Sequence, residues 1–326
     1  MSDAALTTYI QDIAASGVGW LRMDMNWEWL QPNVDGVYQW GRFDRIFTRA
    51  IAAGLKVLPV MWAVPQWARA TSASNKPMVN AWAFGNFARD AVLRYGPGSS
   101  YGAQGITHWQ VWNEPNKSDY WWPAAPNPTG YTEVLQEAAT KIWAADPNAR
   151  VLFGGLAPTP TPGNASNYAA VTFLQEALGL GAADWFDEMS FHPYSHPDMP
   201  SETDAWNGWH IMETGIRSAL DNSTNGLPTA QIWATEYGAP TNGDPSSTDQ
   251  VYHYTPGESG QAAQIGEAIS IFKAMPKSGV LFIYSWKDRP LAGAPHTEKF
   301  FGLRREDGSA KPALRTLTDA TGRTTP

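Results

Sequence analysis

The stretch HWQVWNEPN, residues 108–116, combines a short apolar run with a glutamate near its end. The run is typical of a buried strand, which places Glu114 at the carboxyl end of that strand. The stretch QIWATEYG, residues 231–238, has the same arrangement and places Glu236 at the end of a second strand. Because α/β barrels carry their active sites at the carboxyl ends of the strands, we expect both glutamates on one rim.

Strand-like and helix-like segments alternate along the chain. Short apolar or β-branched runs predict seven strands: Trp20–Asp24, Lys56–Trp62, His108–Trp112, Arg150–Gly154, Glu188–His192, Gln231–Glu236 and Val280–Trp286. Helical patterns lie between them, at Phe43–Ala53, Ala81–Tyr95, Thr129–Ala145 and Glu258–Met275. This order predicts an α/β fold, a (β/α)8 TIM barrel forming a single catalytic domain over residues 1–326.

The predicted barrel is one strand short of eight. The chain opens on a helix-like segment, Asp3–Ser16, where the usual first strand would be expected. A gap at that place would expose two strand edges unless another segment fills it. The Pro- and Thr-rich stretch Ala157–Asn167 follows a strand, so we interpret it as a loop of the active-site face and not as a domain boundary.

The composition narrows the classes of function. The 326 residues carry a net charge of −8 without a long basic run, so neither nucleic acid nor an anionic membrane is an expected partner. Cysteine is absent, which excludes disulfides, thiolate zinc sites and cysteine nucleophiles. No apolar run is long enough to cross a bilayer, and the first residues do not form a signal peptide. The 17 Trp residues offer flat faces that suit sugar rings, although a large core buries many of them.

Polar and aromatic residues gather where the predicted strands end, in MDMNW, VMWAVPQW, VWNEPN, SFHPYSHP, ATEYGAP and YSWKD. Cleavage of a glycosidic bond requires two facing carboxyl groups, one to protonate the leaving oxygen and one to attack the anomeric carbon. Glu114 and Glu236 meet this requirement if both strands belong to one barrel. A surface or helix-capping role for the two glutamates is the alternative.

The segment VWNEPN followed by SFHPY and ATEYG resembles the clan A glycoside hydrolases, family 39 most closely and family 5 as a neighbour. The resemblance extends from Gly17 to about Leu317. It implies that Glu114 is the acid/base, that Glu236 is the nucleophile, and that cleavage retains the anomeric configuration through a covalent glycosyl-enzyme. It also implies that Asn113 binds the sugar 2-hydroxyl and that Arg22 keeps the nucleophile ionised and oriented.

The resemblance further implies supporting roles for three residues. His192 and Tyr194 would lie near the two carboxyl groups, and Trp286 would lie under the sugar at the cleavage site. A structural histidine and ordinary core packing are the alternatives. Four more residues are candidate sugar platforms, with packing or an exposed loop as an equal alternative: Trp62, Trp67, Trp121 and Trp122.

No cofactor and no metal are expected. His192 and His196 have the HxxxH spacing of a metal-ligand pair, but Pro193 and Pro197 prevent the helix that would align the two rings. No glycine-rich phosphate loop follows a predicted strand, and the G-x-S-x-G motif of serine hydrolases is absent.

The sequence therefore predicts a retaining β-glycoside hydrolase that acts on an oligo- or polysaccharide, as an extracellular monomer. An endo-acting enzyme is favoured, because family 39 exo-enzymes often carry a β-sandwich region and little chain follows Leu317. An exo-acting β-xylosidase or β-glucosidase is one alternative. A catalytically silent carbohydrate-binding barrel is another, although both glutamates are present together with Asn113 and Arg22.

Overall fold

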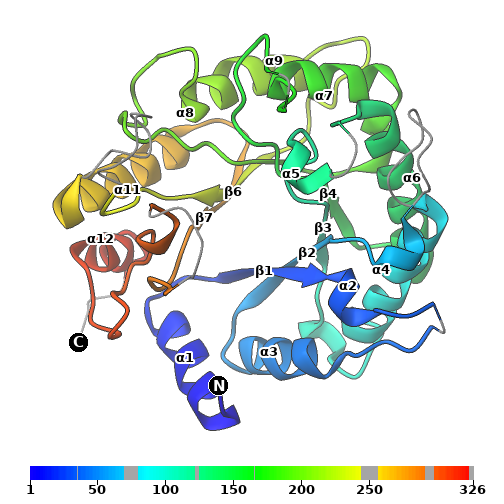
Figure 1. Cartoon of the computed structure of the whole chain (residues 1–326), viewed down its shortest axis with the longest axis horizontal. Helices are drawn as coiled ribbons and strands as arrows, with labels where there is room; N and C mark the ends of the chain where they lie inside the picture. The colour runs from blue at the N-terminus through cyan, green and yellow to red at the C-terminus, as the bar shows by residue number, and fades with distance from the viewer. Residues whose placement is uncertain are drawn as a thin grey trace.

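The computed structural model describes residues 1–34, 36–69, 80–121, 125–164, 166–243, 256–290 and 297–322. Its strands pair in parallel and lie inside a ring of helices (Figure 1). The strands are β1 (Trp20–Asn26), β2 (Lys56–Trp62), β3 (His108–Val111), β4 (Arg150–Leu152), β5 (Met189–Phe191), β6 (Ile232–Tyr237) and β7 (Ser278–Ile283). Each overlaps one of the predicted strands, which confirms the α/β barrel fold.

The strands follow chain order around the barrel. They form one sheet of four, β1-β2-β3-β4, and one of three, β5-β6-β7. Isolated parallel bridges Leu152↔Glu188 and Leu156↔Phe191 join β4 to β5. Among the described residues no ladder joins β7 to β1, so the barrel is open at this place, which we call the seam. A cavity of about 980 Å³ is lined by both of these strands. The expected gap at the first strand is thus present as an open seam.

Helices cover the outside of the strands. The longer ones are α1 (Asp3–Ala15), α3 (Gly41–Ala52), α4 (Ala81–Tyr95), α6 (Pro128–Ala145), α7 (Ala170–Gly179), α11 (Gly257–Ala274) and α12 (Pro312–Ala320). The short ones are α2 (Trp27–Leu30), α5 (Ser118–Trp121), α8 (Gly208–His210) and α9 (Arg217–Leu220), with a π-helical turn at Ile211–Ile216 between the last two. Asn80 and Asn127 cap α4 and α6 by accepting hydrogen bonds from backbone N–H groups of the first turn.

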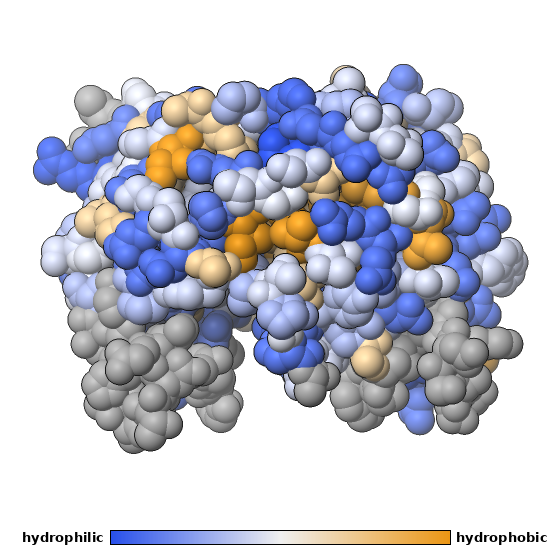
Figure 2. Space-filling model, turned by 90° about the horizontal axis from the view of Figure 1, so that it is seen from above, coloured by the Kyte–Doolittle hydropathy of each residue, from blue (hydrophilic) through white to orange (hydrophobic). Residues whose placement is uncertain are grey.

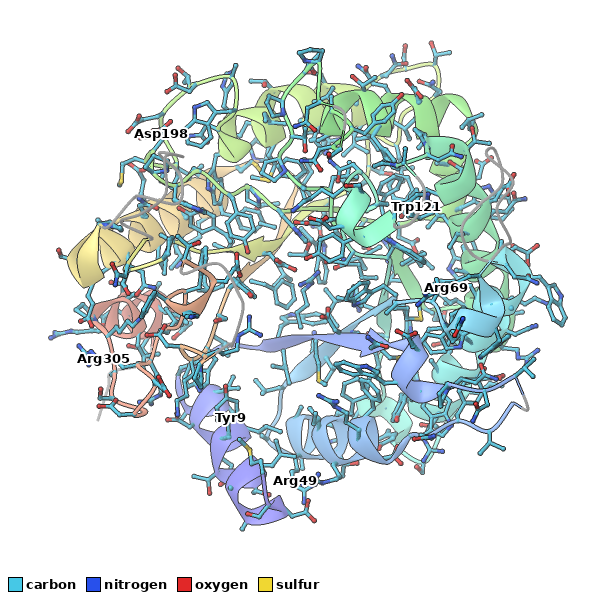
Figure 3. The ribbon with its side chains drawn as sticks, viewed as in Figure 1. Tyr9, Arg49, Arg69, Trp121, Asp198 and Arg305 are labelled. Carbon is cyan, nitrogen blue, oxygen red and sulfur yellow. The ribbon has the colours of Figure 1, made fainter. Side chains whose placement is uncertain are left out.

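Apolar side chains fill the interior of the barrel, as Figure 3 shows. Leu58, Leu152, Trp233 and Phe282 are buried there, and Trp20 packs against them. The Trp20 and Trp233 rings meet edge to face with centroids 5.1 Å apart. Burial of each large apolar side chain contributes about 1.5–3 kcal/mol to the stability of the fold. This cluster therefore helps to stabilise the strands that carry the candidate site.

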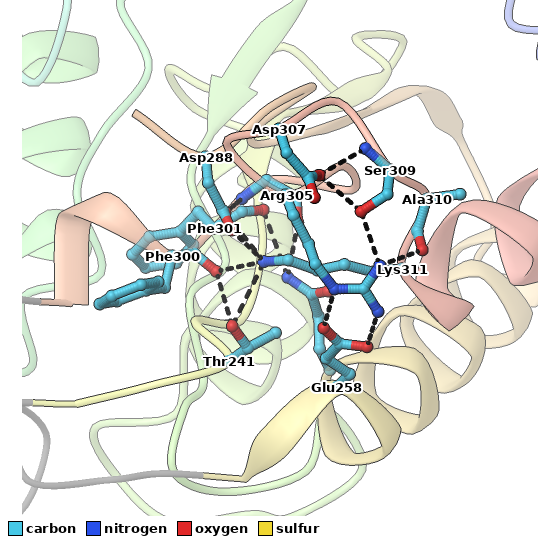
Figure 4. Close-up of polar contacts among 12 residues, drawn as sticks. Thr241, Glu258, Asp288, Phe300, Phe301, Arg305, Asp307, Ser309, Ala310 and Lys311 are labelled. Atoms are coloured by element: carbon cyan, nitrogen blue, oxygen red, sulfur yellow. Dashed lines mark hydrogen bonds and ion pairs between the residues drawn. The ribbon is translucent and has the colours of Figure 1, made fainter. Parts of the chain in front are cut away.

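The segment after β7 is fixed to the rest of the rim by a buried lysine (Figure 4). Lys311 Nζ lies 2.8 Å from the Asp288 carboxylate and also donates to Thr241 Oγ1 and to the Phe300 carbonyl. Nearby, Arg305 forms two hydrogen bonds with Glu258 of α11, at 2.7 and 2.6 Å. These contacts link the loops that follow β6 and β7 to the C-terminal helices.

The face of the molecule shown in Figure 2 is polar over most of its area, with apolar residues mainly across its middle. None of the helices in the described part of the chain is long and apolar enough to span a bilayer.

Candidate active site

The structure brings Glu114 and Glu236 together at the carboxyl ends of β3 and β6. One side-chain oxygen of each glutamate and one ring nitrogen of His192 all lie within 4.8 Å of one another. Glu114 is pinned by its backbone N–H, which donates to the Gly155 carbonyl at 2.9 Å. Trp112 and Glu114 both have positive φ, +80° and +42°. Non-glycine residues in this region are strained, and such strain often occurs at functional sites.

Arg22 of β1 connects the two glutamate-bearing strands. Its Nη1 lies 2.5 Å from Glu236 Oε1, and its Nη2 donates to Asn113 Oδ1 at 2.7 Å. Its Nε donates to Gln110 Oε1 at 3.2 Å. One guanidinium group therefore holds the carboxylate of Glu236 and the amide of Asn113 in a fixed relation.

His192 lies between the two carboxyl groups and is fully buried. Its Nδ1 is 2.9 Å from Glu114 Oε1, and its Nε2 is 3.8 Å from Glu236 Oε1. Gly155 makes room for this ring, since a Cβ atom at that position would lie 2.2 Å from His192 Nε2. The imidazole can thus interact with both glutamates at once.

Both oxygens of Glu236 have donors. Arg22 binds Oε1, and the Tyr194 hydroxyl donates to Oε2 at 3.1 Å. Burial acts to raise the pKa of Glu236, but His192, Arg22 and the Tyr194 hydrogen bond outweigh it and hold the pKa below its usual value. Glu236 is therefore an ionised carboxylate at neutral pH.

Three residues near this pair were not singled out from the sequence. Gln110 orients Arg22, and its side-chain amide also donates to the Trp112 carbonyl at 2.9 Å. Lys117 Nζ lies 3.3 Å from Glu114 Oε2, three residues further along the chain. The Tyr120 ring packs on Trp62 with centroids 5.3 Å apart. Of these contacts, only the Glu114–Lys117 spacing is a local signal that the sequence could have offered.

The tryptophans separate into two groups. Trp62 is the last residue of β2, and Trp286 lies three residues after the end of β7. Each has a buried indole N–H without a hydrogen-bond partner among the described residues. Arg304 covers one face of Trp286, with its Cζ 5.2 Å from the ring centroid. By contrast, Trp67 donates to the Gln31 carbonyl, and Trp121 of α5 (labelled in Figure 3) is buried, so both match the packing alternative. Trp122 lies outside the described residues.

Two groups of side chains within the described residues have oxygen or nitrogen atoms close enough to hold a metal ion. One is Glu114, His192 and Glu236, whose atoms are already engaged with one another and with Arg22. The other is the acidic set Asp198, Glu202 and Asp204. His196 belongs to neither group.

Solved structures with a similar architecture include glycoside hydrolases. A family 39 glycoside hydrolase from the gut symbiont Bacteroides cellulosilyticus WH2 matches with a TM-score of 0.71 at 20% identity, over 98% of this chain and 61% of that one. The chain has the fold of a family 39 glycoside hydrolase. A monomeric β-xylosidase from Caulobacter crescentus CB15 shares this fold, with a TM-score of 0.65 at 17% identity over 98% of this chain and 64% of that one.

The family 5 relationship is also present. The GH5_18 enzyme from Streptomyces cattleya, in complex with GlcNAc, matches with a TM-score of 0.72 at 16% identity, over 100% of this chain and 77% of that one. The expected likeness to families 39 and 5 is thus confirmed at the level of the fold. The chain spans less than two thirds of the length of the family 39 enzyme and of the β-xylosidase. No protein-family model and no curated protein matches it.

Proposed function

We propose that the protein is a retaining β-glycoside hydrolase in which Glu236 is the nucleophile and Glu114 the acid/base. The main support is that a carboxylate oxygen of one glutamate lies within 4.8 Å of one of the other. Retaining glycosidases hold their carboxyl groups about 5–5.5 Å apart, whereas inverting enzymes need about 6.5–9.5 Å to admit a water molecule.

The surroundings of each glutamate support this division of roles. Glu236 has a lowered pKa and is fixed by Arg22 and Tyr194, as an attacking carboxylate requires. Glu114 contacts His192 and Lys117, two groups that carry or exchange protons. Asn113 lies beside Glu114 and is oriented by Arg22, which suits a hydrogen bond to the sugar 2-hydroxyl.

The reaction then has two steps. Glu236 attacks the anomeric carbon to form an ester, while Glu114 protonates the oxygen of the departing group. Glu114, now ionised, removes a proton from water as the water attacks the same carbon and releases Glu236. Two inversions at the anomeric carbon give net retention.

We further propose that the substrate is an oligo- or polysaccharide, cut internally by a monomeric, extracellular enzyme. The test is digestion of soluble xylan, mixed-linkage glucan and mannan. Chromatography of the products should show oligosaccharides early in the reaction, and proton NMR should show the β-anomer as the first product. Release of monosaccharides alone would contradict endo action and would indicate the alternative, an exo-acting β-xylosidase or β-glucosidase. A first product with the α-configuration would overturn retention.

Replacing Tyr194 with phenylalanine should move the acid limb of the kcat/KM–pH profile to higher pH. Glu236 must be ionised to attack, so activity falls as pH drops through its pKa. Losing the Tyr194 hydrogen bond raises that pKa. Tyr168→Phe is the matched control, because Tyr168 donates to Glu176 at 2.6 Å in an exposed pair. An acid limb that stays in place in Tyr194→Phe would contradict the proposed control of the nucleophile.

A further inference from the structure

The cavity at the seam reaches the catalytic groups and contains one more carboxylate. Arg22, Asp24, Glu236 and Trp286 all line it. Asp24 lies two residues after Arg22 in β1, so the two side chains point to the same face of the strand. Unlike Glu114 and Glu236, Asp24 is exposed and forms no ion pair within 4 Å among the described residues. Its oxygens are therefore open to a ligand in the cavity.

A donor faces this acceptor from the neighbouring strand. In the β1–β2 ladder Asp24 is opposite Val60, and Trp62 is two residues further on, on the same face. The indole N–H of Trp62 is close enough to lower the pKa of Asp24, yet it is buried without a completed hydrogen bond among the described residues. An unpartnered buried N–H is costly, which favours a ligand that supplies the missing acceptor.

A sugar hydroxyl group can contact both of these side chains at once because it both donates and accepts. We propose that Asp24 and Trp62 together bind one ring hydroxyl of the sugar at the cleavage position, with the hydroxyl donating to Asp24 and accepting from the indole N–H. This assignment rests on the proposed glycosidase function. It makes Asp24 a substrate-binding residue of the catalytic subsite and leaves the chemical steps to Glu114 and Glu236.

The experiment compares the wild type with Asp24→Asn and Trp62→Phe on 4-nitrophenyl β-glycosides. The probes are the β-D-xyloside, glucoside, galactoside, mannoside and glucuronide. The glycoside that is cleaved best is also tested as its 3-deoxy and 4-deoxy analogues. Asp24→Asn should lower kcat/KM on the order of 10–100-fold, as expected for a hydrogen bond to a charged group. On the deoxy analogue that lacks the bound hydroxyl, the same substitution should lower kcat/KM by less than about 3-fold.

Asp184→Asn is the matched control, because Asp184 is an exposed aspartate in the 3-10 helix Ala182–Trp185. Equal losses for Asp24→Asn on the parent glycoside and on both deoxy analogues would overturn the assignment. If the wild type cleaves none of these probes and none of the three polysaccharides, the proposed function itself fails; if it cleaves one of the probes and Asp24→Asn matches it, only this inference fails.

Discussion

Glu236→Ala should reduce kcat for β-glycoside hydrolysis by roughly 10⁴–10⁶-fold, the scale seen when a covalent nucleophile is removed. The carboxylate that forms the ester would be gone, while Arg22 and Tyr194 would remain around an empty space of about the size of a small anion. Added sodium azide should enter this space and attack the anomeric carbon on the face that Glu236 uses. The product should be an α-glycosyl azide, identified by NMR, together with a partial recovery of rate.

Glu133→Ala is the control for Glu236→Ala, since Glu133 is an exposed glutamate on the outer helix α6 and should leave the rate unchanged. Glu133→Ala should keep the wild-type melting temperature to within a few degrees, whereas Glu236→Ala leaves the buried Arg22 guanidinium without its partner and should lower it. Full activity of Glu236→Ala would remove the nucleophile assignment, and a β-glycosyl azide would reverse the roles of the two glutamates.

Glu114→Gln should have an effect that depends on the leaving group. General acid catalysis contributes about 10²–10⁴-fold, and its loss matters most when the departing oxygen is basic. The rate of oligosaccharide hydrolysis should therefore fall by a factor near the upper end of this range. The dinitrophenolate group of a 2,4-dinitrophenyl β-glycoside leaves without being protonated. Formation of the glycosyl-enzyme from this substrate should therefore be almost unaffected and should appear as a burst of dinitrophenolate.

Stopped-flow absorbance measures this burst. The smaller variant Glu114→Ala, supplied with azide, should give a β-glycosyl azide, because the anion then attacks the ester from the face where Glu114 lies. Equal losses in Glu114→Gln for alkyl and dinitrophenyl leaving groups would show that Glu114 does not protonate the departing oxygen.

The catalytic pair could be predicted because its signal is local. An apolar run followed by Glu114 or Glu236 is visible in the sequence, and the barrel topology brings the strand ends to one rim. Arg22 was expected near the nucleophile from the family resemblance, and it does contact Glu236. Gln110 and Asp24 are different, because their meaning depends on which residues lie beside them in neighbouring strands. That register is a property of the assembled sheet and has no counterpart in a single strand sequence.

Aromatic residues show the same limit. Trp62 and Trp121 were both candidate sugar platforms, yet one lies at the end of β2 facing Asp24 and the other is buried against Trp112. Indole suits both a sugar face and a core, so packing decides between them. The α8–α9 segment was not predicted either. Its π-helical turn at Ile211–Ile216 breaks the 3.6-residue repeat by which helices are recognised.

The contacts at the candidate active site also connect the two sheets of the barrel. Arg22 belongs to the sheet of four strands and Glu236 to the sheet of three, and Glu114 and His192 are divided between the two halves in the same way. The Arg22–Glu236 ion pair thus connects the two sheets beside the open seam, and the His192–Glu114 contact connects them on the side where β4 meets β5. A change that separates the two sheets would move Glu114 away from Glu236, so these contacts both orient the proposed catalytic groups and fix the two sheets relative to one another.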